Sequence, residues 1–169
     1  SGFSRYIADP LSLKKESLDN LEVPYAHIES VTDIPQDGRY CTEAMIVHDA
    51  LQQHQLMNIL KQHGSSIVLS SNAKQCRFHV HTDKPWDVFN EIQAIGKIHN
   101  PKVDDMLRQY ETINTRKHHI ALVTDSNADL PKEYCDEHQI HLLPLNVHIE
   151  GNDLLDKYSI QTQQFYDKL

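Results

Sequence analysis

The order of apolar patterns between residues 39 and 103 is the feature that most limits what this chain can fold into. Four short segments have the composition or alternation of strands, and two segments carry apolar residues at helical spacing. The expected strands are 39–48, 66–71, 75–82 and 97–103, and the expected helices run from Asp49 to Gly64 and from Pro85 to Gly96. This β-α-β-β-α-β order predicts a ferredoxin-like split βαβ sheet with two helices on one face.

A second α/β unit is expected after a polar segment that contains a short helix near Met106. The continuous apolar run 120–123 predicts a buried parallel strand, followed by a polar loop at 125–129. The remaining expected elements are a helix over 131–138, a strand over 140–149, a turn at 151–152 and a helix from residue 160. Such a unit cannot close a doubly wound sheet, so we expect a truncated second α/β domain.

These patterns divide the chain into four parts. Residues 1–35 show no sustained period and are expected to be a tail or linker after a missing domain. Residues 36–110 form the ferredoxin-like domain, 111–117 form a linker, and 118–169 form the N-terminal portion of the second domain.

Composition narrows the functional classes. The formal net charge of −8 argues against a nucleic-acid or membrane-surface role, because both need basic patches. No apolar run approaches the roughly 18 residues of a membrane span, and no signal peptide opens the sequence. Three widely spaced cysteines do not make a disulfide framework. We therefore expect a cytoplasmic protein without a membrane span.

The strongest chemical constellation combines one cysteine and two histidines. His79 and His81 lie two residues apart on an expected strand, so their side chains share a face. In a ferredoxin-like sheet that strand lies beside the one carrying Cys41, which brings a thiol to two imidazoles. This is a zinc-type ligand set. The alternative is a buried apolar Cys41 with two ordinary surface histidines.

Only three protein ligands for a metal are evident from the sequence. The fourth could be water, a residue of another chain or a group of a missing domain, and Glu43 and Asp83 are candidates for the fourth ligand or for supporting the others. A three-ligand zinc with an open position could activate water, so a zinc-dependent hydrolase is a rival hypothesis. A structural or interface-fixing metal is favoured, because no convergent base or substrate cleft is identifiable; a stand-alone metal-binding regulatory module is a further alternative.

A second candidate site follows the expected strand at 120–123. Asp125 and Ser126 lie at its carboxyl end, where open α/β sheets bind ligands. The alternative is that Asp125, Ser126 and Asp129 cap the helix that begins near Pro131.

Two sets of motifs resemble known families. The sequences GRYCTE at 38–43 and HVHTD at 79–83 resemble the middle domain of the fatty acid kinase A subunit, which is also described as dihydroxyacetone-kinase-like. The sequence ALVTDSNADLP at 121–131 resembles the opening of DegV proteins, which bind fatty acids. Together the two resemblances cover residues 36–169.

The resemblance implies a metal at Cys41, His79 and His81, and a homodimer formed through the middle domain. It implies that ATP and magnesium bind a separate kinase domain, for which this chain has no glycine-rich phosphate loop. We expect this chain alone to be inactive as a kinase. In the intact protein the middle domain would couple ATP-dependent acyl phosphorylation to fatty-acid binding, by an acyl-binding protein or a fused DegV module.

Overall fold

The computed structural model describes residues 34–48, 53–72 and 74–167 of the chain. The described elements belong to one unit of mutual contacts. The expected tail lies almost wholly outside these residues, and so does Asp49, the expected helix cap. Within the described part, no helix is long and apolar enough to cross a bilayer.

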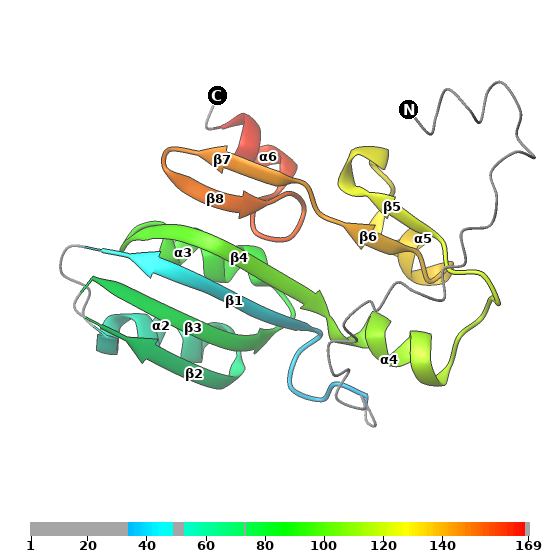
Figure 1. Cartoon of the computed structure of the whole chain (residues 1–169), viewed down its shortest axis with the longest axis horizontal. Helices are drawn as coiled ribbons and strands as arrows, with labels where there is room; N and C mark the ends of the chain where they lie inside the picture. The colour runs from blue at the N-terminus through cyan, green and yellow to red at the C-terminus, as the bar shows by residue number, and fades with distance from the viewer. Residues whose placement is uncertain (1–33, 49–52, 73, 168–169) are drawn as a thin grey trace, which may run out of the picture. The chain divides into compact units, whose positions relative to one another are not determined.

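A four-stranded antiparallel sheet forms the first half of the described chain (Figure 1). Its strands follow the order β2-β3-β1-β4, and each agrees with an expected strand to within two residues at either end. Their bounds are β1 Tyr40–Val47, β2 Ser65–Ser71, β3 Gln75–Thr82 and β4 Lys97–Asp105. The predicted order of elements is confirmed here, and β1 is an inner strand beside β3, as expected.

Two helices cover one face of this sheet (Figure 1). Helix α2 spans Gln53–His63, and helix α3 spans Pro85–Ile92 with its proline in the first turn, where a missing N–H costs nothing. Alternate residues of β1 and β3 point toward the helices and are buried. The core between them is built from Ala44, Ile46, Leu56, Leu60, Cys76, Phe78, Val80, Val88, Phe89, Ile92 and Ile98. Among residues 34–48, 53–72 and 74–167, no helix lies across the opposite face, which is called the helix-free face below.

After the sheet, helix α4 (Met106–Asn114) leads into a short parallel pair, β5 (Val123–Asp125) and β6 (His141–Leu143), joined through helix α5 (Lys132–Glu137). The parallel pairing agrees with the sequence prediction, but the predicted burial of 120–123 is wrong. Ile120 is 85% exposed and Leu122 is 59% exposed. Of this run only Val123 belongs to β5, which in the described part pairs only with β6, and Val123 is 52% exposed as well.

The expected strand at 140–149 is two strands, which corrects the sequence prediction. Pro144 follows β6, and the chain then starts β7 (Asn146–Ile149), which forms a hairpin with β8 (Asn152–Leu155). The hairpin lies against β4, where the Asn152 side chain accepts a hydrogen bond from the Ile98 backbone N–H at 3.0 Å. The last helix, α6 (Thr162–Tyr166), places Phe165 against the core, as predicted.

Candidate metal centre

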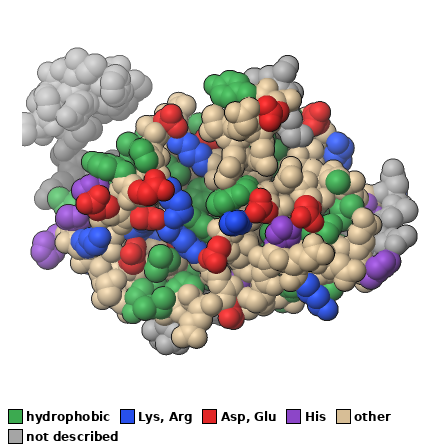
Figure 2. Space-filling view, turned by 180° about the vertical axis from the view of Figure 1, so that it is seen from behind, with side chains coloured by type: hydrophobic (Ala, Val, Ile, Leu, Met, Phe, Trp, Pro, Cys, Tyr) green, Lys and Arg blue, Asp and Glu red, His purple; other side chains and the backbone are tan. Residues whose placement is uncertain are grey.

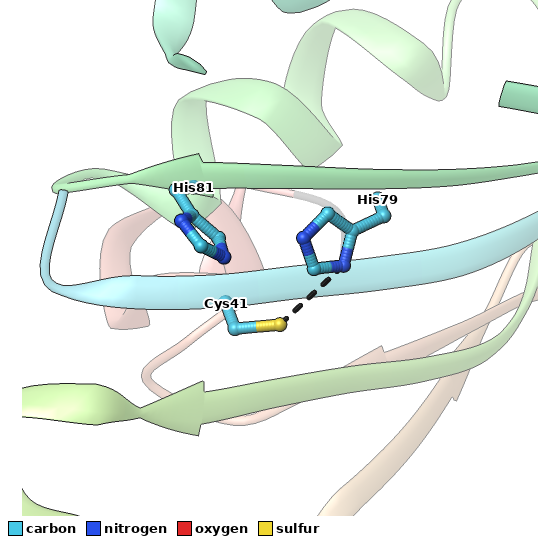
Figure 3. A group of neighbouring side chains, drawn as sticks. All are labelled: Cys41, His79 and His81. Atoms are coloured by element: carbon cyan, nitrogen blue, oxygen red, sulfur yellow. Dashed lines mark hydrogen bonds between the residues drawn. The ribbon is translucent and has the colours of Figure 1, made fainter. Parts of the chain in front are cut away.

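The three residues singled out from the sequence lie together on the face of the sheet opposite the helices. Cys41 is directly opposite His81 in the β1–β3 register, and His79 is opposite Glu43. Because alternate strand residues share a face, Cys41, His79 and His81 emerge on one side while their neighbours Tyr40, Thr42 and Val80 enter the core. Figure 3 shows the thiol of β1 and the two imidazoles of β3 converging.

Their spacing is suitable for one metal ion. One ligand atom from each residue lies within 4.8 Å of the others. The distance from Cys41 Sγ to His79 Nδ1 is 3.6 Å. A tetrahedral zinc with ordinary Zn–S and Zn–N bond lengths separates sulfur from nitrogen by about 3.6 Å. The same distance also allows a hydrogen bond between the thiol and the imidazole.

The electrostatic surroundings set the protonation states of this cluster. Burial, followed by the nearby carboxylates of Glu43 and Asp104, raises the pKa of the Cys41 thiol to about 11. Burial and the neighbouring His79 lower the pKa of His81. At neutral pH the metal-free cluster thus has a protonated thiol next to a neutral His81 imidazole. A metal must displace the thiol proton to bind there.

Of the two supporting candidates, Glu43 lies at the cluster and Asp83 does not. Glu43 Oε1 is 3.1 Å from His79 Nδ1 and accepts a long hydrogen bond of 3.8 Å from the Cys41 thiol. Burial by itself would raise the pKa of Glu43, but the hydrogen bond with His79 and the charge of Lys102 lower it. Asp83 instead accepts a hydrogen bond from the Arg39 backbone N–H at 2.9 Å. Glu43 is therefore the carboxylate that contacts the cluster, although it is not among the three residues whose ligand atoms all lie within 4.8 Å of one another.

Two neighbours of the cluster were missed by the sequence reasoning. Asp104 of β4 is directly opposite Cys41 on its other side, and Lys102 is opposite Glu43. Their ammonium and carboxylate form an ion pair. The signal that could have found them is the register of β4 against β1, which depends on an irregularity between Glu43 and Met45 that no sequence pattern indicates.

The second candidate pair lies away from this cluster and has local structural contacts. Asp125 caps a short 3-10 helix, accepting a hydrogen bond from the Asn127 backbone N–H at 3.1 Å. Ser126 is buried, and its hydroxyl accepts a hydrogen bond from the Leu145 backbone N–H at 3.1 Å. The capping alternative is therefore wrong as stated: Asp125 caps the 3-10 helix, whereas helix α5 begins after Pro131 without a side-chain cap. A ligand role for the pair stays a prediction.

Both resemblances noted in the sequence are confirmed by comparison with protein families. Residues 37–113 match the FakA-like middle-domain family, named after the middle domain of the fatty acid kinase A subunit. Residues 119–169 match the DegV family, described as uncharacterised proteins. The chain thus contains a match to this middle domain followed by a match to the DegV family. All three residues of the cluster lie in the middle-domain match, whereas Asp125 and Ser126 lie in the DegV match.

Curated relatives match parts of this chain at modest identity. An uncharacterised protein of Staphylococcus saprophyticus is 31% identical over 110 residues, which is 63% of this chain and 20% of that protein. One from Staphylococcus epidermidis is 31% identical over 78 residues, covering 44% of this chain and 14% of its own length. One from Staphylococcus aureus is 29% identical over 86 residues, covering 48% and 16% respectively. The chain therefore spans a fifth or less of these relatives.

Proposed function

We propose that the middle domain binds one zinc ion through Cys41, His79 and His81 and that the zinc fixes the structure of this end of the sheet. The observation that carries the proposal is the convergence of one thiol and two imidazoles from adjacent strands, with ligand atoms within 4.8 Å of one another. Nitrogen and sulfur donors favour zinc over magnesium or calcium, which prefer oxygen ligands. When bound, the zinc supplies a cross-link between β1 and β3.

A structural role agrees better with the surroundings than the rival zinc-dependent hydrolase. The ligands are half-buried on a helix-free sheet face. A hydrolase needs a cleft in which a metal-bound water meets substrate. A cavity of about 420 Å³ in the described part is lined by other residues, among them Trp86, Leu142 and Tyr158. Zinc-dependent hydrolysis of an activated ester, lost in His81→Ala, would instead favour the hydrolase.

For the intact protein we propose a fatty-acid-kinase-like function, which rests on the descriptions of the two matched families. In this proposal a separate nucleotide domain binds ATP and magnesium and phosphorylates an acyl group. The middle domain is non-catalytic, forms the homodimer and joins that chemistry to a fatty-acid-binding DegV module or partner. The purified chain should neither turn over ATP nor bind a fatty acid tightly, and measurable ATP turnover by the chain alone would contradict this.

The same proposal includes the finer description of the fold and its boundaries. We assign residues 36–110 to a ferredoxin-like domain, 111–117 to a linker and 118–169 to part of a DegV-like domain. The antiparallel order β2-β3-β1-β4 with a helix after β1 and another after β3 supports the first assignment.

Titration with cobalt(II), a common spectroscopic substitute for zinc, tests the thiolate ligation. Binding through Cys41 should produce the near-ultraviolet sulfur-to-cobalt charge-transfer absorption that oxygen and nitrogen ligands alone do not give. Cys41→Ser should lose this band, whereas Cys76→Ser, which changes a cysteine buried in the core, should retain it. A band of equal strength in both variants, or none in the wild type, would contradict the assignment.

A further inference from the structure

Arg39 lies two residues before Cys41 and connects the middle domain to helix α5. Its side chain is only 15% exposed and donates to two carboxylates. Nε donates to Asp105 Oδ1 at the end of β4 at 3.0 Å. Nη1 and Nη2 donate to both oxygens of Asp136 on α5 at 2.8 and 2.6 Å. A two-pronged guanidinium–carboxylate contact of this kind fixes orientation as well as distance.

Asp136 is held from a second side by Arg108 of α4. Arg108 is 5% exposed and donates to Asp136 Oδ1 at 2.9 Å and to the Cys135 carbonyl at 3.1 Å. Lys132 donates to the same carboxylate at 2.6 Å. Although burial opposes it, the hydrogen bonds from Arg39 and Lys132 hold the pKa of Asp136 well below its ordinary value. Helix α5, in the DegV match, is therefore attached through one ionised carboxylate to two guanidinium groups of the middle-domain match.

The backbone of Arg39 is tied to the strands that carry the metal-ligand candidates. Its N–H donates to Asp83, two residues after His81, at 2.9 Å. Its carbonyl accepts a hydrogen bond from Met106 N–H at the start of α4 at 3.0 Å. Arg39 thus contacts the end of the His79–His81 strand, precedes the strand of Cys41 and reaches α5. If the ends of β1 and β3 are joined more firmly, the backbone of Arg39 is restrained, and Arg39 is the residue that binds Asp136.

We infer that metal binding at Cys41, His79 and His81 is coupled through Arg39 to the attachment of helix α5 by Asp136. This inference rests on the proposed zinc site. Zinc would cross-link β1 and β3 next to Arg39 and restrict its backbone, so the guanidinium would spend more time in the geometry that binds Asp136. Because coupling between two equilibria is reciprocal, breaking the Asp136 contact must weaken zinc binding by the same factor by which zinc strengthens the contact.

The coupled contact also borders the cavity of about 420 Å³. Arg39, Arg108 and Asp136 line one part of it, and Trp86, Leu142 and Tyr158 provide apolar lining. On the face seen in Figure 2, acidic and basic side chains gather around an apolar hollow. The residues that line the cavity come from both matched segments, so a change in the attachment of α5 would change the width of the cavity.

Hydrogen–deuterium exchange of α5, read by mass spectrometry with and without zinc, tests the coupling. In the wild type, zinc should slow exchange of the 132–140 amides by about fivefold, the low end of ordinary couplings between sites. Asp136→Asn removes the charge and one acceptor oxygen and should abolish this slowing. Glu133→Gln, the same change at an exposed position on the same helix, should leave it intact. Zinc affinity should fall by the same factor in Asp136→Asn and stay unchanged in Glu133→Gln.

Arg39→Lys is a second variant that keeps the charge but loses the two-pronged contact, and it should reduce the zinc-dependent slowing. Stoichiometric zinc binding with no slowing in the wild type, or with equal slowing in Asp136→Asn, would overturn the coupling and leave the zinc proposal standing. Absence of zinc binding in the wild type would overturn both. Loss of zinc affinity in Asp136→Asn together with loss of slowing, in a variant with wild-type circular dichroism, would support the coupling.

Discussion

At the scale of single residues, the three cysteines differ in their neighbours more than in their chemistry. Cys76 is fully buried in the core and Cys135 is nearly so, at 7% exposed. Cys41 is half-buried on the helix-free face and has two imidazoles and a carboxylate beside it. Burial raises the pKa of Cys76 as well, so a shifted thiol pKa alone does not distinguish a ligand from a core residue. The two imidazoles beside Cys41 distinguish it as the candidate ligand.

Zinc affinity should rise with pH. Because the metal-free Cys41 thiol has a pKa of about 11, it is protonated throughout the neutral range and releases its proton on binding. The apparent affinity should therefore increase by about tenfold per pH unit between about pH 7 and 9 and fall more steeply where histidines become protonated. Competition with a chromophoric zinc chelator at several pH values measures this. An affinity independent of pH would contradict thiolate ligation.

Ionised Asp136 should stabilise the folded protein at neutral pH, and this contribution to the free energy of unfolding should be lost in acid. Its folded-state pKa is depressed, so its contribution to the free energy of unfolding is fully present above the unfolded value of about 4 and declines as pH falls toward the folded pKa. Urea unfolding at pH 7 and pH 3 should show a larger loss for the wild type than for Asp136→Asn. Equal losses in the two proteins would mean that this carboxylate is not specifically stabilised.

At the scale of elements, the sequence predicted best where the alternation of side chains decides the structure. The alternation over 75–82 and the positions of Cys41, His79 and His81 identified β3, its neighbour β1 and the shared face. Prediction failed where the outcome depends on neighbours that local pattern does not encode. The run at 120–123 is exposed because only Val123 enters a strand, and that strand pairs with β6 alone in the described part. Strand β8 was missed because its few residues do not alternate regularly.

A side chain at Gly64, just after α2, should destabilise the fold and disturb the metal site. A Cβ there would lie 2.0 Å from the His81 carbonyl oxygen and 2.8 Å from a Val80 methyl group, so the backbone of β3 must move. We expect Gly64→Ala to lower the free energy of unfolding by about 1–3 kcal/mol and to weaken zinc binding.

The matched control is Gly151→Ala, at a position with φ +78° where the nearest atoms to the new Cβ lie 3.8 Å away, in the Lys97 side chain. It should cost stability through backbone strain of about 1–2 kcal/mol and leave zinc binding unchanged. Denaturant unfolding and zinc titration of both variants measure the two effects. Unchanged zinc affinity in Gly64→Ala would show that the strand tolerates the shift without disturbing the cluster.

At the scale of the whole molecule, the helix-free face of the sheet is the surface we expect to mediate self-association. Val68 of β2 is 61% exposed and lies opposite His79, so it belongs to the face that carries the metal cluster. A homodimer formed there would cover that apolar side chain and the cluster together. We therefore predict that the dimer interface and the zinc site lie on the same surface of the sheet.

The chain should sediment as a dimer at micromolar concentration. Val68→Lys should shift it toward monomer, because a lysine at the contact would bury an unpaired charge. Ile113→Lys is the control, since Ile113 is 54% exposed on α4. Sedimentation velocity over a concentration series measures the equilibrium. A wild type that stays monomeric throughout, or equal dissociation in both variants, would contradict this assignment of the interface.

The zinc content of the purified chain tests the central claim most directly. Elemental analysis of wild-type protein prepared without chelators should give about one zinc per chain, as expected for a single site with one cysteine and two histidine ligands. Cys41→Ser should lose most of that zinc, and Cys76→Ser should keep it. Wild-type protein without a transition metal, or an equal loss of zinc from both variants, would contradict the account.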